Sequence, residues 1–515
     1  MVVRMENKMK KNKPNILFMM SDHQLLHQHG VEYGPKIIRN NYEKFVKEGV
    51  EFTRAYSSNP LCGPTRRCVL SGLYSHHHGE ILNDVNVPYT QRTYLDILKD
   101  EGYRNYYYGK WHAGPGTAHD HGCDGYCYPS YGNPYITKEY LEYRKEKNLP
   151  QPEIMIENTM DPWRLDIKPG EKYIQNKEWS NEQASGIMLA PKESHEAFFL
   201  ADMVCKKLEQ LKNENSDKPF SMRLDFWGPH DPYFVTQEYA DLYDPSEIPM
   251  YPTFDSDLSD KPECYKKEHN LGISDENQNL IIPNPIPWSK WQMMIARAYS
   301  HITMIDDAMG IVLNKLKELG LEDDTMVVMT TDHGDALACQ GGKFDKASYM
   351  VEEVMRVPLA IRYPGVIKKG LVSDALVSNL DIPVTILDAI GSKFDYEPDG
   401  KSLLDLISHN FKNRREFFVS ETYGHLHRNL AKSMVTQRYK YTVNKEDMSE
   451  LYDLIIDPFE TKNLIYEKKY QALIKEMDDK LHKWVKEQGD NFFDGDSQYV
   501  LDELLSRGTS KPRDY

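Results

Sequence analysis

The chain has 515 residues, which is too long for one ordinary domain and suits one large domain with a smaller one beside it. Hydrophobic residues make up 40% and charged residues 28%, the balance of a folded globular chain. The 79 acidic residues outnumber the 63 Lys and Arg, and the net charge of -16 argues against a protein that coats nucleic acid. No apolar stretch approaches the roughly 20 residues of a membrane span, so we expect neither nucleic acid nor membrane as a partner.

The start of the chain and its cysteines favour a cytoplasmic protein. Residues 1–14 are polar and basic, and the apolar run Ile16–Met20 is too short for the core of a signal peptide. Seven cysteines form an odd and sparse set, which is typical of reduced thiols. A chain from which a signal had been removed would look the same.

The first third of the chain alternates short apolar runs with helical patterns. Ile16–Met20 predicts a buried strand, residues 42–48 a helix ending at Gly49, and residues 94–100 a helix that leads into an aromatic strand at 106–108. This rhythm is typical of a mainly parallel sheet covered by helices. Residues 114–193 and 241–290 show little periodicity, so we expect long ordered loops there.

The remaining elements complete an α/β fold with a smaller C-terminal part. Apolar residues at steps of three and four from Met294 to Leu316 predict a long helix capped by Gly320. Strands at 325–331 and 357–363 and a helix at 383–390 follow. Beyond 400 we expect antiparallel strands at 416–422 and 433–443 and a helix at 470–487. We therefore divide the chain into a catalytic α/β domain, residues 14–400, and an α+β subdomain, residues 401–515.

The most informative stretch is Cys62-Gly-Pro-Thr-Arg66-Arg-Cys-Val-Leu-Ser-Gly72. A Pro near the start of a helix pre-organises its first turn, so Cys62 would lie at the positive end of a helix dipole. Arg66, one turn further on, adds a fixed positive charge. Together these groups would form a cradle for a tetrahedral oxyanion.

This stretch resembles the signature of the formylglycine-dependent sulfatases of the alkaline phosphatase superfamily. Every fixed position of that signature is met between Cys62 and Gly72. The resemblance implies a large, mostly parallel sheet between helices, and a maturation enzyme that oxidises Cys62 to formylglycine. It also implies that the hydrated aldehyde attacks sulfur with one hydroxyl and expels sulfate by collapse of the other.

Acidic residues directly after two predicted strands suggest a metal site. Asp22 follows the first strand, and Asp332 and His333 follow the strand 325–331, so their side chains would meet around a hard divalent cation. The resemblance assigns Asp22, residue 62, Asp332 and His333 as ligands. Many sulfatases have a second Asp where this chain has His23, which leaves the metal open: calcium is expected first, with manganese or zinc as alternatives.

Three further motifs match the family. In Gly109-Lys110-Trp111-His112, the resemblance assigns Lys110 to the sulfate oxygens and His112 to the formylglycine hydroxyl. In Pro229-His-Asp-Pro-Tyr233, it assigns His230 to the leaving oxygen. Lys346, preferred over Lys343 on spacing, would join Arg66 and Lys110 on sulfate. Residues 450–464 resemble the C-terminal signature, so the resemblance spans about residues 14–465.

The expected function is therefore hydrolysis of a sulfate ester, with a sulfated saccharide as the leading substrate and a small aryl or choline ester as the alternative. Two rivals stay open: a phosphonate or phosphate monoester hydrolase of the same superfamily, and an inactive protein that binds sulfated glycans. The run His76-His-His78 and the pair Cys123 and Cys127 are interpreted as structural rather than as metal sites. The sequence does not indicate an oligomeric state.

Overall fold

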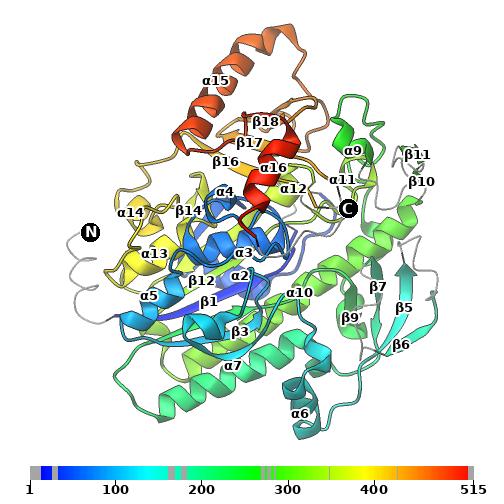
Figure 1. Cartoon of the computed structure of the whole chain (residues 1–515). Helices are drawn as coiled ribbons and strands as arrows, with labels where there is room; N and C mark the ends of the chain where they lie inside the picture. Colours follow the sequence, from blue (N-terminus) through cyan, green and yellow to red (C-terminus); the bar gives the residue numbers. More distant parts are fainter. Residues whose placement is uncertain are drawn as a thin grey trace.

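A computed structural model describes residues 13–25, 33–159, 169–174, 183–267, 273–274, 280–282, 286–346, 348–425 and 427–508. Residues 1–12, from which a cytoplasmic location was partly predicted, lie outside the described residues. The core of the molecule is a nine-stranded sheet in the order β14-β2-β13-β12-β1-β8-β3-β4, with β15 also paired to β2 (Figure 1). Its strands are β1 (Asn15–Ser21), β2 (Val50–Tyr56), β3 (Arg104–Lys110), β4 (Cys123–Tyr128), β8 (Phe220–Asp225), β12 (Thr325–Thr331), β13 (Arg356–Arg362), β14 (Leu371–Ser373) and β15 (Val377–Ser378).

Only one of these strands runs against the others. β1 pairs in parallel with β12 and β8, and β3 pairs in parallel with β8 and β4. β13 is antiparallel to both β12 and β2. The predicted mixed, mostly parallel sheet is therefore confirmed, and the carboxyl ends of β2, β12, β1, β8 and β3 meet at one edge.

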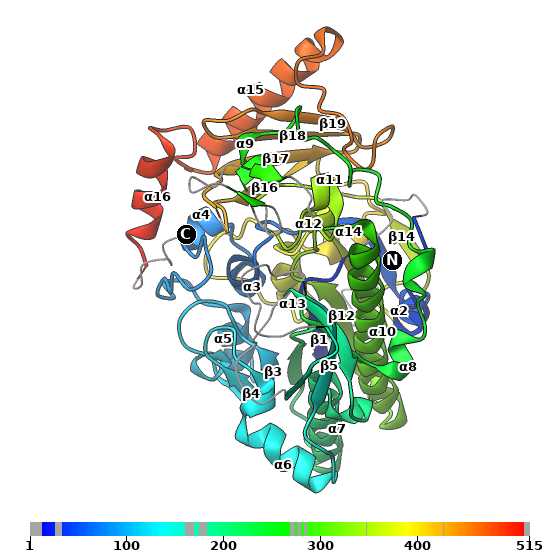
Figure 2. The same cartoon turned by 90° about the vertical axis from the view of Figure 1, so that its right-hand side faces the viewer.

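Helices cover both faces of the sheet, as Figure 2 shows. Leu17 and Met19 of β1 pack toward one layer, whereas Ile16, Phe18 and Met20 pack toward the other. This alternation explains why β1 is a continuous apolar run. The first layer contains α2 (Asn40–Val46), α7 (Glu196–Asn213) and α10 (Trp288–Glu318), and the second contains α3 (Cys62–Ser71), α5 (Tyr94–Asp100), α13 (Asp381–Ala389) and α14 (Leu403–Ser408).

The longest helix, α10, confirms the predicted helix and extends it toward the N-terminus. Gly320 adopts a left-handed backbone with φ of 62° just beyond the helix end, as its predicted capping role requires. Among the described residues, no helix is long and apolar enough to cross a membrane.

The interpretation of residues 114–193 as long loops is wrong. The structure places β4 there, at the edge of the central sheet, and α6 (Lys138–Glu146). Three strands of this segment, β5 (Glu153–Thr159), β6 (Lys172–Ile174) and β7 (Ala184–Met188), form a second sheet with the later strand β9 (Tyr233–Thr236). The strand order of this sheet is β6-β5-β7-β9. The described residues of 241–290 are closer to the prediction: before α10 they form short elements, namely a 3-10 helix (Pro245–Glu247), α9 (Glu263–Lys267), β10 (Ile273–Ser274) and β11 (Leu280–Ile282).

The C-terminal part is a separate antiparallel sheet, seen at the top of Figure 1. It contains β16 (Phe417–Thr422), β17 (Ala431–Thr436), β18 (Tyr439–Asn444) and β19 (Glu450–Asp453), with α15 (Gln471–Glu487) and α16 (Ser497–Leu505). The predicted strand 433–443 is a hairpin of two strands, β17 and β18. α14 packs with α13 in the layer of helices that covers the central sheet. The C-terminal antiparallel sheet begins at Phe417, later than the predicted boundary at residue 400. The exact domain boundary stays a prediction.

Candidate active site

The candidate site lies where the carboxyl ends of neighbouring strands converge. Asp22 directly follows β1, and the register pairs Ser21 with Thr331, so Asp332 follows β12 at the same level. Lys110 is the last residue of β3. The residue before it, Gly109, pairs with Asp225, the last residue of β8. Acidic and basic side chains from distant parts of the sequence are thus brought to one edge of the sheet.

Cys62 reaches this edge from the start of α3. Leu61 precedes the helix in an extended conformation, and Cys62 is the first helical residue. The Cys62 thiol is almost fully buried, with Sγ 3.2 Å from Nε2 of His333 and 3.7 Å from Oδ1 of Asp22. The predicted nucleophile therefore lies directly against two of the predicted metal ligands.

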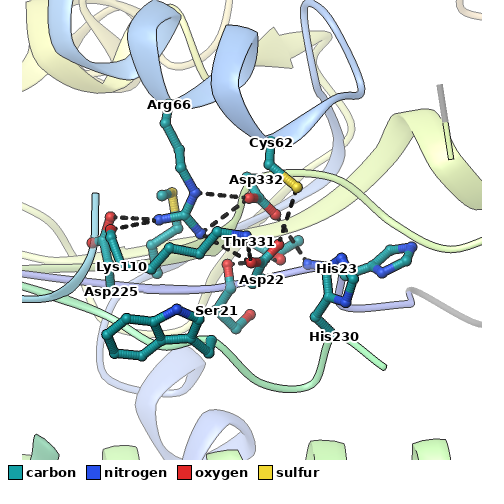
Figure 3. A network of polar contacts seen from close by, with 12 residues as sticks. Ser21, Asp22, His23, Cys62, Arg66, Lys110, Asp225, His230, Thr331 and Asp332 are labelled. Carbon is teal, nitrogen blue, oxygen red and sulfur yellow. Dashed lines mark hydrogen bonds and ion pairs between the residues drawn. The ribbon is translucent and has the colours of Figure 1, made fainter. Parts of the chain in front are cut away.

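Two basic side chains hold the acids in place (Figure 3). The Arg66 guanidinium donates through Nε to Asp332 at 3.1 Å and through Nη1 to Asp225 at 3.0 Å. Lys110 donates to Asp22, and its ammonium lies 3.9 Å above the ring of Tyr131. Arg66 is thus occupied by protein carboxylates, whereas the sequence assigned it to sulfate oxygens.

Burial and positive charge compete at these groups. Burial would raise the pKa of the Cys62 thiol, but Lys110, Lys346 and His333 hold that pKa well below its ordinary value. Burial and Cys62 would likewise raise the pKa of Asp22, yet Lys110 and Arg66 lower it. The pKa of Asp332 is raised by burial and by Asp22, because two carboxylates share one site.

The predicted metal ligands form a compatible donor set. One ligand atom from each of Asp22, Cys62, Asp332 and His333 lies within 4.8 Å of the other three, and all four side chains are buried. His333 donates its Nδ1–H to the Gly334 carbonyl, 2.8 Å away, which orients Nε2 toward the acids. Two carboxylates, an imidazole and residue 62 fit a divalent cation.

A second group of predicted residues lies beside Cys62. Lys346 approaches His230, with Nζ 2.9 Å from Nε2, and pairs with Asp345 at 2.6 Å. His112 also lowers the pKa of the Cys62 thiol. Lys343, the rival to Lys346, donates instead to the carbonyl of Tyr265. The structure therefore brings Lys346 to the site and leaves Lys343 outside it.

His23 does not join the donor set of Asp22. Its Nδ1 lies 3.6 Å from Asp231, and its Nε2 lies 3.6 Å from Asp345 and 3.7 Å from Asp335. His23 and His112 also have left-handed backbones, with φ of 64° and 43°, a conformation that is uncommon for non-glycine residues.

Several acids of the site were missed by the sequence analysis. Asp225 ends β8 and accepts hydrogen bonds from Arg66, from Tyr107 at 2.7 Å and from Arg223 at 2.8 Å. Its place at a strand end was the same signal that revealed Asp22. Asp345 lies in a loop, and only the three-dimensional structure reveals its pairing with Lys346.

A sequence model of the family described as "Sulfatase" matches residues 14–392, most of the chain. The chain belongs to the sulfatase family. A second family model, "N-sulphoglucosamine sulphohydrolase, C-terminal", matches residues 340–487. The expected class of sulfuric ester hydrolases and the alkaline-phosphatase-like fold are thereby confirmed.

Known proteins resemble this sulfatase along nearly its whole length. An N-acetylglucosamine-6-O-sulfatase of Bacteroides thetaiotaomicron is 27% identical over 93% of this chain and 87% of its own. A solved structure in complex with its substrate, D-glucosamine-2-N,6-O-disulfate, has a TM-score of 0.68 at 23% identity, covering 93% of this chain and 99% of its own. A phosphonate monoester hydrolase from Silicibacter pomeroyi has a TM-score of 0.72 at 18% identity, covering 93% and 97%. At these identities the two structures support the fold alone.

Proposed function

We propose that this sulfatase hydrolyses a sulfate ester of a saccharide through a formylglycine formed from Cys62, with a divalent metal bound beside it. The observation that carries the proposal is the position of Cys62. It lies at the start of α3, within 3.7 Å of Asp22 and 3.2 Å of His333, and it faces Lys110 and Lys346. The saccharide is supported by the related N-acetylglucosamine-6-O-sulfatase.

The residues around Cys62 would take different roles. Lys110 and Lys346 would bind the sulfate group and neutralise the charge that develops on its oxygens, and His112 would contact the formylglycine hydroxyl. His230, whose Nδ1 lies 2.7 Å from the Asp231 carbonyl, would donate a proton to the leaving alcohol oxygen. Arg66 would act indirectly, since it holds Asp332 and Asp225 in place. A hydrated formylglycine at residue 62 would supply one hydroxyl to attack sulfur, and loss of the proton from its other hydroxyl would restore the aldehyde, break the C–O bond to sulfate and release it.

Asp22, Asp332 and His333 would hold the metal, together with residue 62. A bound dication would supply Lewis-acid stabilisation of negative charge at this edge of the sheet. Because the set contains an imidazole and His23 faces other acids, we propose manganese or zinc ahead of the calcium that the sequence favoured. A maturation enzyme that oxidises Cys62 is the partner that this function requires.

The mass of the tryptic peptide Ala55–Arg66 tests the proposal after co-expression with a formylglycine-generating enzyme. We expect an aldehyde or its hydrate at residue 62 and turnover of aryl sulfates. Cys62→Ala should abolish turnover while leaving the fold intact. An intact thiol beside a working maturase, or turnover that survives Cys62→Ala, would disprove the mechanism and favour a protein that only binds sulfated glycans.

A second candidate is the hydrolysis of phosphonate or phosphate monoesters. It is favoured by His23, which stands where many sulfatases have a further acidic ligand and which lies outside the donor set here. Rates on matched aryl sulfate and aryl phosphonate esters would separate the two reactions. We expect the larger kcat/KM for the sulfate ester.

A further inference from the structure

The segment that carries His230 is attached to the first residue of α7. Gly228, two residues before His230, donates its backbone N–H to Oε1 of Glu196 at 3.0 Å. The carbonyl of the same Gly228 accepts the backbone N–H of Asp22, also at 3.0 Å. One residue, Gly228, therefore connects Glu196 both to a proposed metal ligand and to the segment of the proposed proton donor.

Packing from α10 fixes this peptide from the other side. A Cβ atom on Gly228 would lie 2.5 Å from Nε2 of His301 and 2.8 Å from Cδ1 of Ile305. These distances are too short for any side chain at position 228. The Gly228 backbone is thus held between Glu196 of α7 and His301 of α10, and it has no room to shift toward α10.

A small cavity lies between Glu196 and His230. It is lined by Glu196, His195, His301, His230 and aromatic residues, and its free volume of about 10 Å³ is the minimum for one water molecule. No part of a saccharide fits there. Glu196, only 1% exposed, therefore cannot touch substrate, and any role in the reaction must pass through the groups that it holds.

We propose that Glu196 is a positioning residue that clamps the Gly228 peptide and thereby fixes Asp22 and His230 relative to Cys62. This inference deepens the proposed function and rests on it for its kinetic test alone. Neither the family match nor the related proteins assign a role to this glutamate.

The ionisation of Glu196 fits a hydrogen-bonded clamp in an apolar setting. Burial raises the pKa of Glu196 to about 8, although the N–H groups of Gly228 and Trp227 lower it. The titratable groups that face it are His195, Tyr135, His301 and His230, with Asp22 beyond Gly228. Burial lowers the pKa of His195 to about 3 and the pKa of His301 well below its ordinary value. At neutral pH the carboxyl is therefore protonated beside neutral His195 and His301, whereas the pKa of His230, which burial would lower, is raised well above its ordinary value by Asp231.

Three variants test the clamp kinetically on an aryl sulfate. Glu196→Ala removes the acceptor and should lower kcat by about tenfold to a hundredfold, with KM within about twofold, because the reacting groups lose alignment. Glu196→Gln keeps the acceptor oxygen and should stay within about threefold of the unaltered enzyme. Glu193→Gln removes an exposed carboxyl three residues away and should change neither constant. Unchanged kcat in Glu196→Ala, or an equal loss in Glu196→Gln, overturns the inference.

A crystal structure of Glu196→Ala separates this inference from the proposed reaction, since it needs no turnover. We expect the Gly228 carbonyl to leave the Asp22 N–H and the 2.9 Å approach of His230 to Lys346 to lengthen. An unmoved peptide overturns the clamp even in an active sulfatase. If the peptide moves in Glu196→Ala while the unaltered, matured protein turns over no sulfate ester, the clamp is supported and the proposed function is refuted.

Urea unfolding between pH 5 and 8 tests the inference even if Glu196→Ala does not fold. The folded chain retains a proton on Glu196 that the unfolded chain loses near its ordinary pKa of 4.5, so stability falls as pH rises. The unfolding constant should rise by up to about tenfold per pH unit more in the unaltered chain than in Glu196→Gln. Parallel pH dependences would contradict a protonated clamp.

Discussion

Two buried clusters of charged side chains in this molecule use the same residue types for different ends. The active-site cluster consists of Asp22, Cys62, Asp332 and His333, with Arg66 and Lys110 beside them. The subdomain cluster consists of His76, Glu421, Lys432 and Asp490, which lie between α4 (Ser75–His78) and the C-terminal part of the chain. In both, acids and a histidine lie within 4.8 Å of one another.

The clusters differ in where the positive charge lies. Lys432 contacts both acids of the subdomain cluster, so its ammonium already fills the place of a cation. In the active-site cluster, Arg66 pairs with Asp332 and Lys110 pairs with Asp22. Asp22 and His333 also lie against the Cys62 thiol, where none of the described Lys or Arg side chains stands between them. Acids and a histidine therefore hold two parts of the chain together in the subdomain cluster, whereas in the active-site cluster they remain suited to a metal.

The largest expected effect comes from Asp332→Asn. We expect kcat on aryl sulfate to fall by about 10⁴-fold, comparable with loss of one catalytic triad member, while the free energy of unfolding changes by no more than about 1 kcal/mol. Stability survives because the change also relieves the repulsion between Asp332 and Asp22. Kinetics and urea unfolding on the same sample check both values. A loss of stability without a loss of kcat would show that this cluster, too, is structural.

Lys432→Met should show the opposite behaviour. Loss of the ammonium removes the Lys432 partner of the buried Glu421 and Asp490, and we expect a loss of about 3–5 kcal/mol in the free energy of unfolding. The folded fraction should keep kcat within about threefold. Lys480→Met is a matched control on α15, where the ion pairs are exposed and the expected change is below about 1 kcal/mol. Equal losses in the two variants would contradict the comparison.

The smallest effect is a pH dependence of stability that belongs to the subdomain cluster. Burial would raise the pKa of Glu421, but His76 and Lys432 lower it below the value of 4.5 expected in the unfolded chain. Its stabilising contribution is then present above pH 4.5 and is lost as the pH falls through the folded pKa, by at most about 1.4 kcal/mol per pH unit. Urea unfolding between pH 3 and 5 should show a shallower slope for Glu421→Gln. Identical slopes would exclude a charged Glu421.

The sequence predicted the residues of the active site better than their partners. Asp22 and Asp332 follow buried strands, and parallel strands deliver their ends to one edge, so their proximity followed from local pattern. Arg66 was predicted at the site, but its contacts with Asp225 and Asp332 depend on how α3 lies over β8 and β12. Glu196 carried no local signal, because its partner Gly228 is brought to it only by folding.

The fold shows the same limit. The long helix α10 and the strands β1 and β12 have strong periodicity and were predicted within a few residues. The second sheet was missed, although β5 alternates buried and half-buried residues as a strand with one buried face should. β5 pairs with β7, and β7 pairs with the distant β9, and sequence periodicity does not identify such partners.

The attachment of β16 to the residues before Cys62 sets an order of events during synthesis. The Glu421 N–H donates to the Ser58 carbonyl, and the side chain of Leu61 packs with Val419 and Met434 of the C-terminal part. An enzyme that modifies Cys62 needs this segment as an accessible peptide, yet the finished fold encloses it. Under the proposed function, modification of Cys62 would therefore have to precede the docking of the strands from Phe417 onward.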